Sequence, residues 1–255
     1  MKIRIHFFLI LALGCHFKLY CQETTFFVQP VETNNAYSLD TDSHYVAIDK
    51  TVPHLDKLLL YIGGTKSTPK NTTLFLKLAA NLGFHAIAIT YPNSTSIQSA
   101  CGLSKDSSCF EKFRQEACYG TPGSNSINID SVNSLSRRAF HLLHYLHSRF
   151  PEDNWNQFIR GNQLHWDHIT TAGHSQGAGH ALYFAKTNKI DRCIMFSGAN
   201  DFSQYFDTTA NWISKDFTTP KDEIFCFLHM QDETGYQDQY ELMETLGLTK
   251  FGAGT

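Results

Sequence analysis

The stretch Ile169-Thr-Thr-Ala-Gly-His-Ser-Gln-Gly177 places a serine between two glycines, after a short apolar run and before a row of small residues. This order is typical of a nucleophile elbow, a sharp strand-to-helix turn that exposes the serine at the edge of a sheet. The turn crowds the backbone against the neighbouring strand and helix, so only glycine fits two residues before and after the serine. The stretch therefore predicts that Ser175 is a nucleophile and that the Gln176 N–H donates to a developing oxyanion.

Further short apolar runs have the composition of strands that are covered on both faces, over residues 58–62, 85–91, 193–197 and 224–228. Helical patterns cover residues 71–82, 105–118 and 130–150. Strands that alternate with helices indicate a parallel sheet with right-handed crossovers. We therefore expect an α/β fold with a mostly parallel sheet and helices on both faces.

The composition limits the classes of protein to which the chain can belong. It has 255 residues, of which 42% are hydrophobic and 18% charged, enough for one substantial core in a single domain. The formal net charge is −3, and the lysines and arginines are scattered along the chain. No basic surface is expected, so nucleic acid is excluded as a partner.

Residues 1–21 have the pattern of a secretory signal, with Lys2 and Arg4 ahead of an apolar run over residues 7–13. That run is too short to span a bilayer stably, so no transmembrane segment is expected after signal removal. Cleavage near Gln22 would leave an α/β domain over residues 22–255, secreted or periplasmic. A second option is a weak lipoprotein-type site at Cys15, which would anchor the chain to a lipid.

Export makes the cysteines informative, because an oxidising compartment permits disulfides. Cys101 and Cys109 flank a short polar loop and are the best candidates for a disulfide. Cys193 and Cys226 fall in predicted strands, where we expect buried thiols. The partner of Cys118 stays open.

Residues 92–130 interrupt the alternation of strands and helices and are too long for an ordinary connection. Two interpretations of this insertion stay open. It is either a cap over the site, which would set specificity, or a surface loop held by a disulfide.

Three histidines recur at every third position of the predicted helix that follows the insertion, at His141, His144 and His147. Residues three apart share part of a helix face, which raises the question of a metal site. No carboxylate or cysteine completes a ligand set beside them, so we expect a solvated helix face and no metal.

A second glycine-rich loop, Gly63-Gly64-Thr65-Lys66-Ser67, follows the apolar run over residues 58–62. In a fold with a nucleophile elbow, the loop after this strand supplies the second oxyanion donor. We expect Gly64 or Thr65 to provide that N–H, opposite the N–H of Gln176. Losing one such donor typically costs about 3–4 kcal/mol in the transition state.

Several short motifs occur in one order along residues 55–235: the glycine and threonine loop, Tyr91-Pro92, Cys101-Gly102, Cys109-Phe-Glu-Lys112, Tyr119-Gly120, the elbow and Met195-Phe-Ser-Gly198. In this combination the chain resembles an α/β-hydrolase family of exported microbial proteins, mostly of undefined substrate. The resemblance implies a serine hydrolase fold, with Ser175 as the nucleophile and a disulfide between Cys101 and Cys109. The chain departs from the family at Gly63, where proline is usual, and at Lys66-Ser67, where glycines are usual. A differently shaped oxyanion loop is therefore expected.

An α/β hydrolase presents its catalytic triad in the order serine, acid, histidine. Asp232 follows the last predicted strand and is the preferred acid, and Asp201 after the preceding strand is the alternative. Only two histidines lie beyond Ser175. His180 falls one turn further along the helix and points away, and His229 starts about 10 Å from the serine because strands lie about 4.8 Å apart.

Two explanations of the base stay open. Members of the resembled family continue through another strand and a histidine-bearing loop, so the first expectation is that the chain is C-terminally incomplete and lacks the last strand and helix. The second is an unusual triad of Ser175, Asp201 and His229, which keeps the required chain order.

We expect an exported serine hydrolase that cleaves a carboxylic ester, small-molecule or lipid-like, through an acyl-enzyme on Ser175. This chemistry needs no metal or organic cofactor. The missing histidine motivates an alternative, a non-catalytic binding protein or an inactive truncated hydrolase. A peptidase would share the serine chemistry, and the fold alone does not separate these functions.

Overall fold

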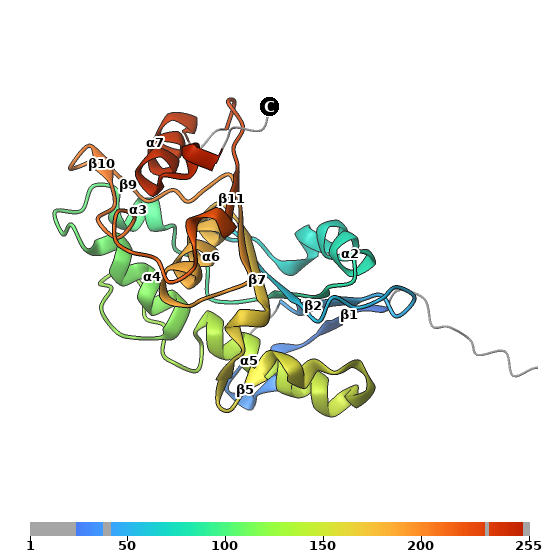
Figure 1. Cartoon of the computed structure of the whole chain (residues 1–255). Helices are drawn as coiled ribbons and strands as arrows, with labels where there is room; N and C mark the ends of the chain where they lie inside the picture. The colour runs from blue at the N-terminus through green and yellow to red at the C-terminus, as the bar shows by residue number, and fades with distance from the viewer. Residues whose placement is uncertain (1–23, 38–41, 233–234, 252–255) are drawn as a thin grey trace, which may run out of the picture.

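A mostly parallel β-sheet forms the centre of the molecule (Figure 1). The structure is a computed structural model that describes residues 24–37, 42–232 and 235–251. Within these residues the central sheet has seven strands in the order β1-β2-β4-β3-β7-β8-β11. They are β1 (Thr24–Val28), β2 (His44–Ile48), β3 (Leu58–Ile62), β4 (His85–Ile89), β7 (Ile169–His174), β8 (Arg192–Phe196) and β11 (Ile224–Phe227).

The direction of the strands decides where the loops gather. β2 runs antiparallel to both β1 and β4, and the other neighbouring strands pair in parallel. In this register Ile62 lies beside Gly173, and His174 lies beside Phe196. The carboxyl ends of β3, β7, β8 and β11 therefore meet at one edge of the sheet, and the loops that leave them build the site.

Helices cover both faces of this sheet (Figure 1). α2 (Thr73–Asn81) packs on one face against β2 and β4, while α6 (Gln176–Thr187) packs on the other against β7 and β8. α4 (Cys109–Tyr119) packs against α6 and α5 (Leu135–Arg149) against α4, and α7 (Tyr236–Leu246) contacts a short hairpin beyond the carboxyl edge. The shorter elements are α1 (Pro30–Thr33), α3 (Ile97–Cys101), β5 (Ile159–Arg160), β6 (Gln163–Leu164) and the hairpin strands β9 (Phe202–Ser203) and β10 (Thr208–Thr209).

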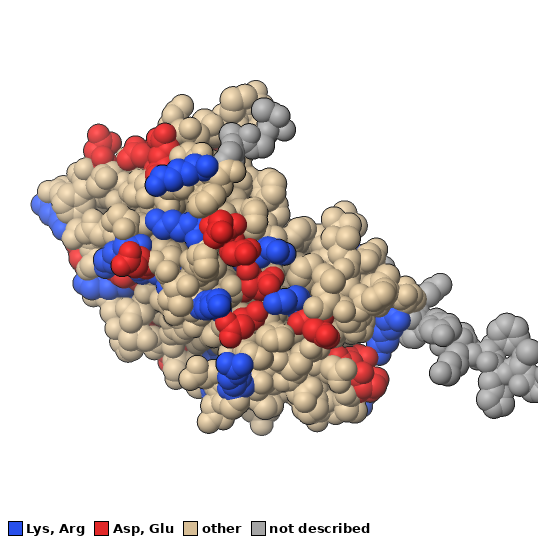
Figure 2. Space-filling model, viewed as in Figure 1, with Lys and Arg blue, Asp and Glu red and all other residues tan. Residues whose placement is uncertain are grey.

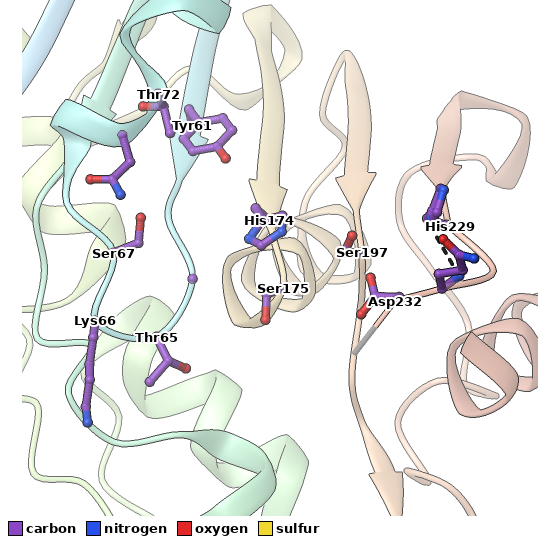
Figure 3. Close-up of a pocket in the computed structure, with 13 residues that line it drawn as sticks. Tyr61, Thr65, Lys66, Ser67, Thr72, His174, Ser175, Ser197, His229 and Asp232 are labelled. Atoms are coloured by element: carbon purple, nitrogen blue, oxygen red, sulfur yellow. Dashed lines mark hydrogen bonds between the residues drawn. The ribbon is translucent and has the colours of Figure 1, made fainter. Parts of the chain in front are cut away.

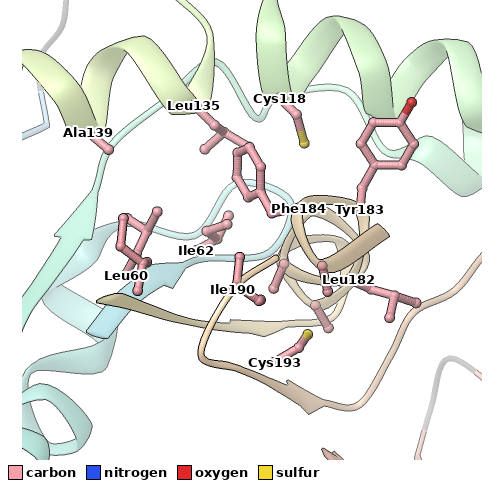
Figure 4. Close-up of a cluster of buried hydrophobic side chains, with 14 of the residues drawn as sticks. Leu60, Ile62, Cys118, Leu135, Ala139, Leu182, Tyr183, Phe184, Ile190 and Cys193 are labelled. Carbon is pink, nitrogen blue, oxygen red and sulfur yellow. The ribbon is translucent and has the colours of Figure 1, made fainter. Parts of the chain in front are cut away.

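The alternation of side chains along β3 explains why both faces carry helices. Leu58, Leu60 and Ile62 are buried with side chains of α5 and α6 in the larger core, part of which is drawn in Figure 4. Leu59 and Tyr61 point to the opposite face and pack with side chains of α2. A strand that is apolar on both faces must be covered on both, as in other parallel sheets.

The predicted fold class is confirmed by the strand order and the helices on both faces. Each strand predicted from an apolar run is present, although the one expected over residues 85–91 ends at Ile89, ahead of Pro92. The helix expected over residues 130–150 begins at Leu135, because the Asp130 carboxylate accepts the Asn133 N–H at 2.8 Å and holds a turn there. The antiparallel strands β1 and β2 were not predicted.

The cysteines lie close to their expected places. The structure contains the Cys101–Cys109 disulfide, which joins α3 to α4. Cys118 and Cys193 are buried free thiols. Cys226 is only partly buried, because β11 is the edge strand of the sheet.

The surface carries no concentration of one charge on the face shown in Figure 2, where acidic and basic side chains are interspersed. Several of them pair, such as Lys57 with Asp191 at 2.7 Å. The predicted signal segment, with Lys2, Arg4 and Cys15, lies outside the described residues. Across the described ranges, no helix is long and apolar enough to cross a membrane.

Candidate active site

Ser175 sits on a strained turn between β7 and α6. Its backbone has φ 53° and ψ −122°, a conformation that non-glycine residues rarely adopt. The Ser175 N–H donates to the Phe196 carbonyl at 2.9 Å, which ties the turn to the end of β8. Such strain is typical of functional sites, where the surrounding structure holds a residue that the chain alone would not place.

The two flanking glycines are required by close backbone contact. A Cβ atom at Gly173 would lie 2.3 Å from the Gly177 carbonyl oxygen. A Cβ atom at Gly177 would lie 2.1 Å from the Ile62 carbonyl oxygen. Strand β3, the turn and α6 therefore approach so closely that only glycine fits, as the elbow pattern predicts.

The loop after β3 lies directly against the serine. A Cβ atom at Gly64 would be 3.2 Å from the Ser175 Cβ and 3.1 Å from the His174 carbonyl oxygen. The Asn93 side chain fixes this loop by donating to the carbonyls of Gly64 and Ser67 at 3.0 and 2.8 Å. Within the described chain the N–H groups of Gly64 and Thr65 donate to no other group, so both are available to an oxyanion.

Gln176, which follows the serine, is held from two sides by the insertion over residues 92–130. Its side-chain oxygen accepts the Ile97 N–H at 2.7 Å, and its carbonyl accepts Arg114 Nη1 at 2.5 Å. Gln176 is also the first residue of α6, so its own N–H has no acceptor within the helix. The insertion thus fixes Gln176, which is one of the two expected oxyanion donors, the other being Gly64 or Thr65.

Asp201 lies in a fully buried ion pair with Arg114. Arg114 Nε donates to its carboxylate at 3.2 Å, Nη2 makes a second contact, and Trp212 Nε1 donates at 2.8 Å. A Cβ atom at Gly179 would overlap the guanidinium, so this glycine admits Arg114 to the helix. The carboxylate is occupied, which argues against Asp201 as the catalytic acid.

Asn200 contacts the serine hydroxyl, a role that the sequence analysis missed. Its Nδ2 donates to Ser175 Oγ at 3.3 Å. Gln239 Nε2 donates to the Asn200 side-chain oxygen at 3.0 Å, so the amide nitrogen faces the serine. In the sequence, Arg114 is only a charged residue in a predicted helix, and Asn200 is only an amide residue after a predicted strand. Neither pattern points to a functional role.

A cleft of about 860 Å³ brings most of the predicted site residues together (Figure 3). We call it the first cleft, and it lies along the carboxyl ends of β3, β7, β8 and β11. Its lining residues are Tyr61, Gly64, Thr65, Lys66, Ser67, Asn71, Thr72, His174, Ser175, Ser197, His229, Gln231 and Asp232.

Two of the candidates for the acid and the base, Asp232 and His229, line this cleft. Asp232 and His229 follow β11, which is separated from β7 by β8 (Figure 3). His229 Nδ1 accepts the Gln231 N–H at 3.2 Å. In the part of the chain that the structure describes, no imidazole nitrogen lies within hydrogen-bonding distance of Ser175 Oγ.

His180 belongs to the core. It is fully buried in α6, stacks on Phe113 and has Cys118 Sγ 3.8 Å from its Nδ1. Burial, and then the charge of Arg114, lower the pKa of His180 well below its usual value. A neutral imidazole in this place has a packing role.

A second cleft of about 410 Å³ meets the first at Ser175 and Thr65. Its other lining residues are Ser96, Gln98, Asn200, Phe202, Gln204 and Asp238. Part of the insertion therefore borders the site at Ser96 and Gln98. Tyr205 and Phe206, which follow Phe202 in sequence, are exposed outside it.

A mostly parallel sheet with a serine on a strained strand-to-helix turn at its carboxyl edge is an α/β-hydrolase fold. No family model matches the chain, and no curated protein matches it in sequence.

Solved structures resemble the chain weakly. A putative dienelactone hydrolase from Klebsiella pneumoniae is 13% identical with a TM-score of 0.44, covering 90% of this chain and 82% of its own. Esterase B from Lactobacillus rhamnosis, inhibited by a tributyrin phosphonate, is 10% identical with a TM-score of 0.47, covering 91% and 76%. A cold-adapted esterase from an Arctic intertidal metagenomic library is 15% identical with a TM-score of 0.44, covering 90% and 81%. These similarities are too weak to assign a fold or a function to the chain. The fold is assigned from the order of the strands and the geometry of the elbow.

Proposed function

We propose that the protein is a serine hydrolase that cleaves carboxylic esters of small molecules through an acyl-enzyme on Ser175. The observation that carries the proposal is the strained serine with the unpaired amides of Gly64 and Thr65 against it and the helix-terminal amide of Gln176 beside it. Amides that point at a place where negative charge develops are the main source of catalysis in acyl transfer.

The reaction would proceed in two displacements. A base takes the Ser175 proton while Oγ attacks the ester carbonyl, and the N–H of Gln176 with that of Gly64 or Thr65 holds the resulting oxyanion. Collapse expels the alcohol, which receives the proton, and water then attacks the acyl-enzyme in the same way. The proposal assigns proton transfer to the first cleft, because Asp232 and the imidazoles of His174 and His229 line it.

Asp232 is the better acid, since it lines the first cleft whereas Asp201 is bound by Arg114. With Asp232 as the acid, the order serine, acid, histidine calls for a histidine later in the chain, and residues 233–255 contain none. With His229 as the base, the order calls for Asp201. The two assignments of the acid therefore require different bases.

Labelling with a fluorophosphonate probe tests the nucleophile. We expect covalent labelling of the wild-type protein and of Ser148→Ala, a control serine exposed on α5, and no labelling of Ser175→Ala. Hydrolysis of p-nitrophenyl acetate should be lost with the label. A folded protein whose wild type is not labelled would contradict the proposal.

A non-catalytic binding protein is the second candidate, favoured by one observation. The group that contacts Ser175 Oγ is the amide nitrogen of Asn200, which donates a hydrogen bond and cannot accept a proton. This candidate expects ester binding that Ser175→Ala leaves unchanged, with no turnover of esters or amides. Turnover of amides alone would instead indicate a peptidase.

We also propose that the protein is exported, with residues 1–21 as the signal. Lys2, Arg4 and the apolar run over residues 7–13 support this proposal. The mass of the mature natural protein tests it, because cleavage near Gln22 predicts the loss of these residues, whereas acylation at Cys15 would retain part of them and add a lipid.

A further inference from the structure

We infer that the substrate is an ester of a compact acyl group with a larger, polyhydroxylated alcohol of the sugar type, and that the alcohol binds in the first cleft. The inference rests on the proposed function and specifies its substrate class. Four observations carry it: the polarity of the first cleft, the open hydroxyl of Tyr61, the position of the proton-transfer groups and the smaller size of the second cleft.

The first cleft has almost no apolar side chain to receive a lipid. Apart from Gly64, each of its lining residues carries a hydroxyl, amide, ammonium, imidazole or carboxyl group. An alkyl chain placed there would remove these groups from water without offering a hydrogen bond in return, which costs free energy at each of them. An alcohol with several hydroxyls would replace the water partners that it displaces.

The hydroxyl group of Tyr61 is one polar group of the first cleft that lacks a partner among the described residues. Its ring packs against Phe75 at the end of β3, with 5.5 Å between ring centroids, and only 7% of the residue is exposed. Among the described residues its hydroxyl has no hydrogen-bond partner, and Tyr61 lines the first cleft. A substrate hydroxyl is a suitable partner, because a buried tyrosine hydroxyl usually finds one.

The position of the proton-transfer groups decides which half of the ester binds in this cleft. His174, His229 and Asp232 line the first cleft, whereas the second cleft has no imidazole among its lining residues. A general acid must come within about 3 Å of the leaving oxygen to protonate it. The alcohol half therefore lies on the side of the first cleft.

The acyl half then enters the second cleft, which has about half the volume. Phe202 is its one apolar lining residue, beside the polar groups of Ser96, Gln98, Asn200, Gln204 and Asp238. This cleft is the smaller of the two, so we expect it to hold the smaller half of the ester. A compact acyl group is therefore expected.

Two series of esters test the inference with the full chain. In the first, p-nitrophenyl esters carry acetyl, butyryl, octanoyl or palmitoyl groups, and kcat/KM should fall with acyl length. In the second, the acetyl group is kept and an O-acetylated methyl glucoside is compared with hexyl acetate. We expect about tenfold or greater preference for the glucoside, the effect of one or two hydrogen bonds. Preference for palmitoyl esters or for hexyl acetate would overturn the inference.

Tyr61→Phe removes the hydroxyl and retains the ring. It should lower kcat/KM for the acetylated glucoside about fivefold, the effect of one neutral hydrogen bond, and lower kcat/KM for p-nitrophenyl acetate by a smaller factor, because the p-nitrophenyl group has no hydroxyl to bind Tyr61. The matched control is Tyr145→Phe on α5, whose hydroxyl donates to Glu32 at 3.2 Å away from both clefts. Gln231→Ala, at an exposed position of the first cleft, is a second variant with little risk to folding. Equal losses on both substrates would contradict the inference.

Fluorophosphonate labelling separates failure of this inference from failure of the proposed function. A labelled enzyme that prefers long alkyl esters retains the proposed function and loses only the substrate class. If the protein is not labelled, titration calorimetry with Ser175→Ala tests the substrate class separately. Binding of the acetylated glucoside and not of hexyl acetate supports a first cleft that binds polyhydroxylated alcohols. Binding of hexyl acetate and not of the glucoside overturns the inference.

Discussion

The side-chain amide of Asn200 donates to Ser175 Oγ at 3.3 Å, across a separation of 25 residues in the chain. Gln239 sets the orientation of this amide, because its Nε2 donates to the Asn200 oxygen at 3.0 Å. The serine oxygen is thereby an acceptor, which leaves the hydroxyl hydrogen free to point elsewhere. The arrangement predicts that Asn200 assists each step in which negative charge develops on Ser175 Oγ.

Asn200→Ala should therefore slow fluorophosphonate labelling about tenfold, the effect of one lost hydrogen bond of about 1–1.5 kcal/mol to the attacking oxygen. The measurement is the second-order rate of labelling at several pH values. Asn125→Ala, an exposed asparagine in the insertion, is the matched control. An unchanged labelling rate in Asn200→Ala would show that the contact has no part in activation of the serine.

The buried ion pair of Arg114 and Asp201 should stabilise the fold strongly. Both side chains have no exposed surface, so Arg114→Met leaves a buried carboxylate without its partner and should lower the free energy of unfolding by about 3–5 kcal/mol. Urea denaturation measures the loss. Adding Asp201→Asn should recover part of it, because the unpaired charge is then removed.

Arg192→Met is the comparison for that measurement. Its ion pair with Glu223 is 3.3 Å long and about half exposed, so the loss should be at most about 1 kcal/mol. Similar losses in Arg114→Met and Arg192→Met would contradict a special role for the buried pair.

The elbow glycine should tolerate no side chain. In Gly177→Ala the added methyl would lie 2.1 Å from the Ile62 carbonyl oxygen, so strand and helix must separate. We expect a loss of at least about 3 kcal/mol in unfolding free energy, at the upper end of single substitutions. In Gly123→Ala the methyl meets Lys112 Cγ at 3.6 Å, an ordinary contact, and the change should stay within about 0.5 kcal/mol. Equal stability of the two variants would refute the close approach.

Acid should destabilise the protein through its buried histidines. Burial, and then the charge of Arg138, lower the pKa of His44 to about 3 from 6.5. Between those two pH values the unfolded chain binds about one proton more at this residue than the folded chain does, so the free energy of unfolding falls as the pH falls. Urea midpoints measured from pH 7 to pH 4 should fall accordingly.

His44→Asn checks this assignment. Asparagine retains an acceptor for the Thr90 N–H, which donates to His44 Nδ1 at 3.1 Å, and it does not titrate. The variant should take up about one proton fewer on unfolding in this pH range. A pH dependence identical to that of the wild type would mean that His44 does not contribute.

The sequence by itself determined the features that depend on local pattern. The apolar runs of β3, β7, β8 and β11 and the glycines around Ser175 are visible without a structure, because periodicity and close backbone contact restrict residue type at each position. The Cys101–Cys109 disulfide was predicted for the same reason, since both cysteines flank one short loop.

Only the tertiary structure decided which polar groups meet. Arg114 contacts Gln176 and Asp201, which lie 62 and 87 residues away in the chain. Its ion pair with Asp201 argues against Asp201 as the catalytic acid. No local pattern encodes these partners, because they come together through the packing of α4 on α6 and the order of β7, β8 and β11. Side-chain hydrogen bonds depend on atomic positions that the whole fold sets, whereas strands and turns depend on neighbours in the chain.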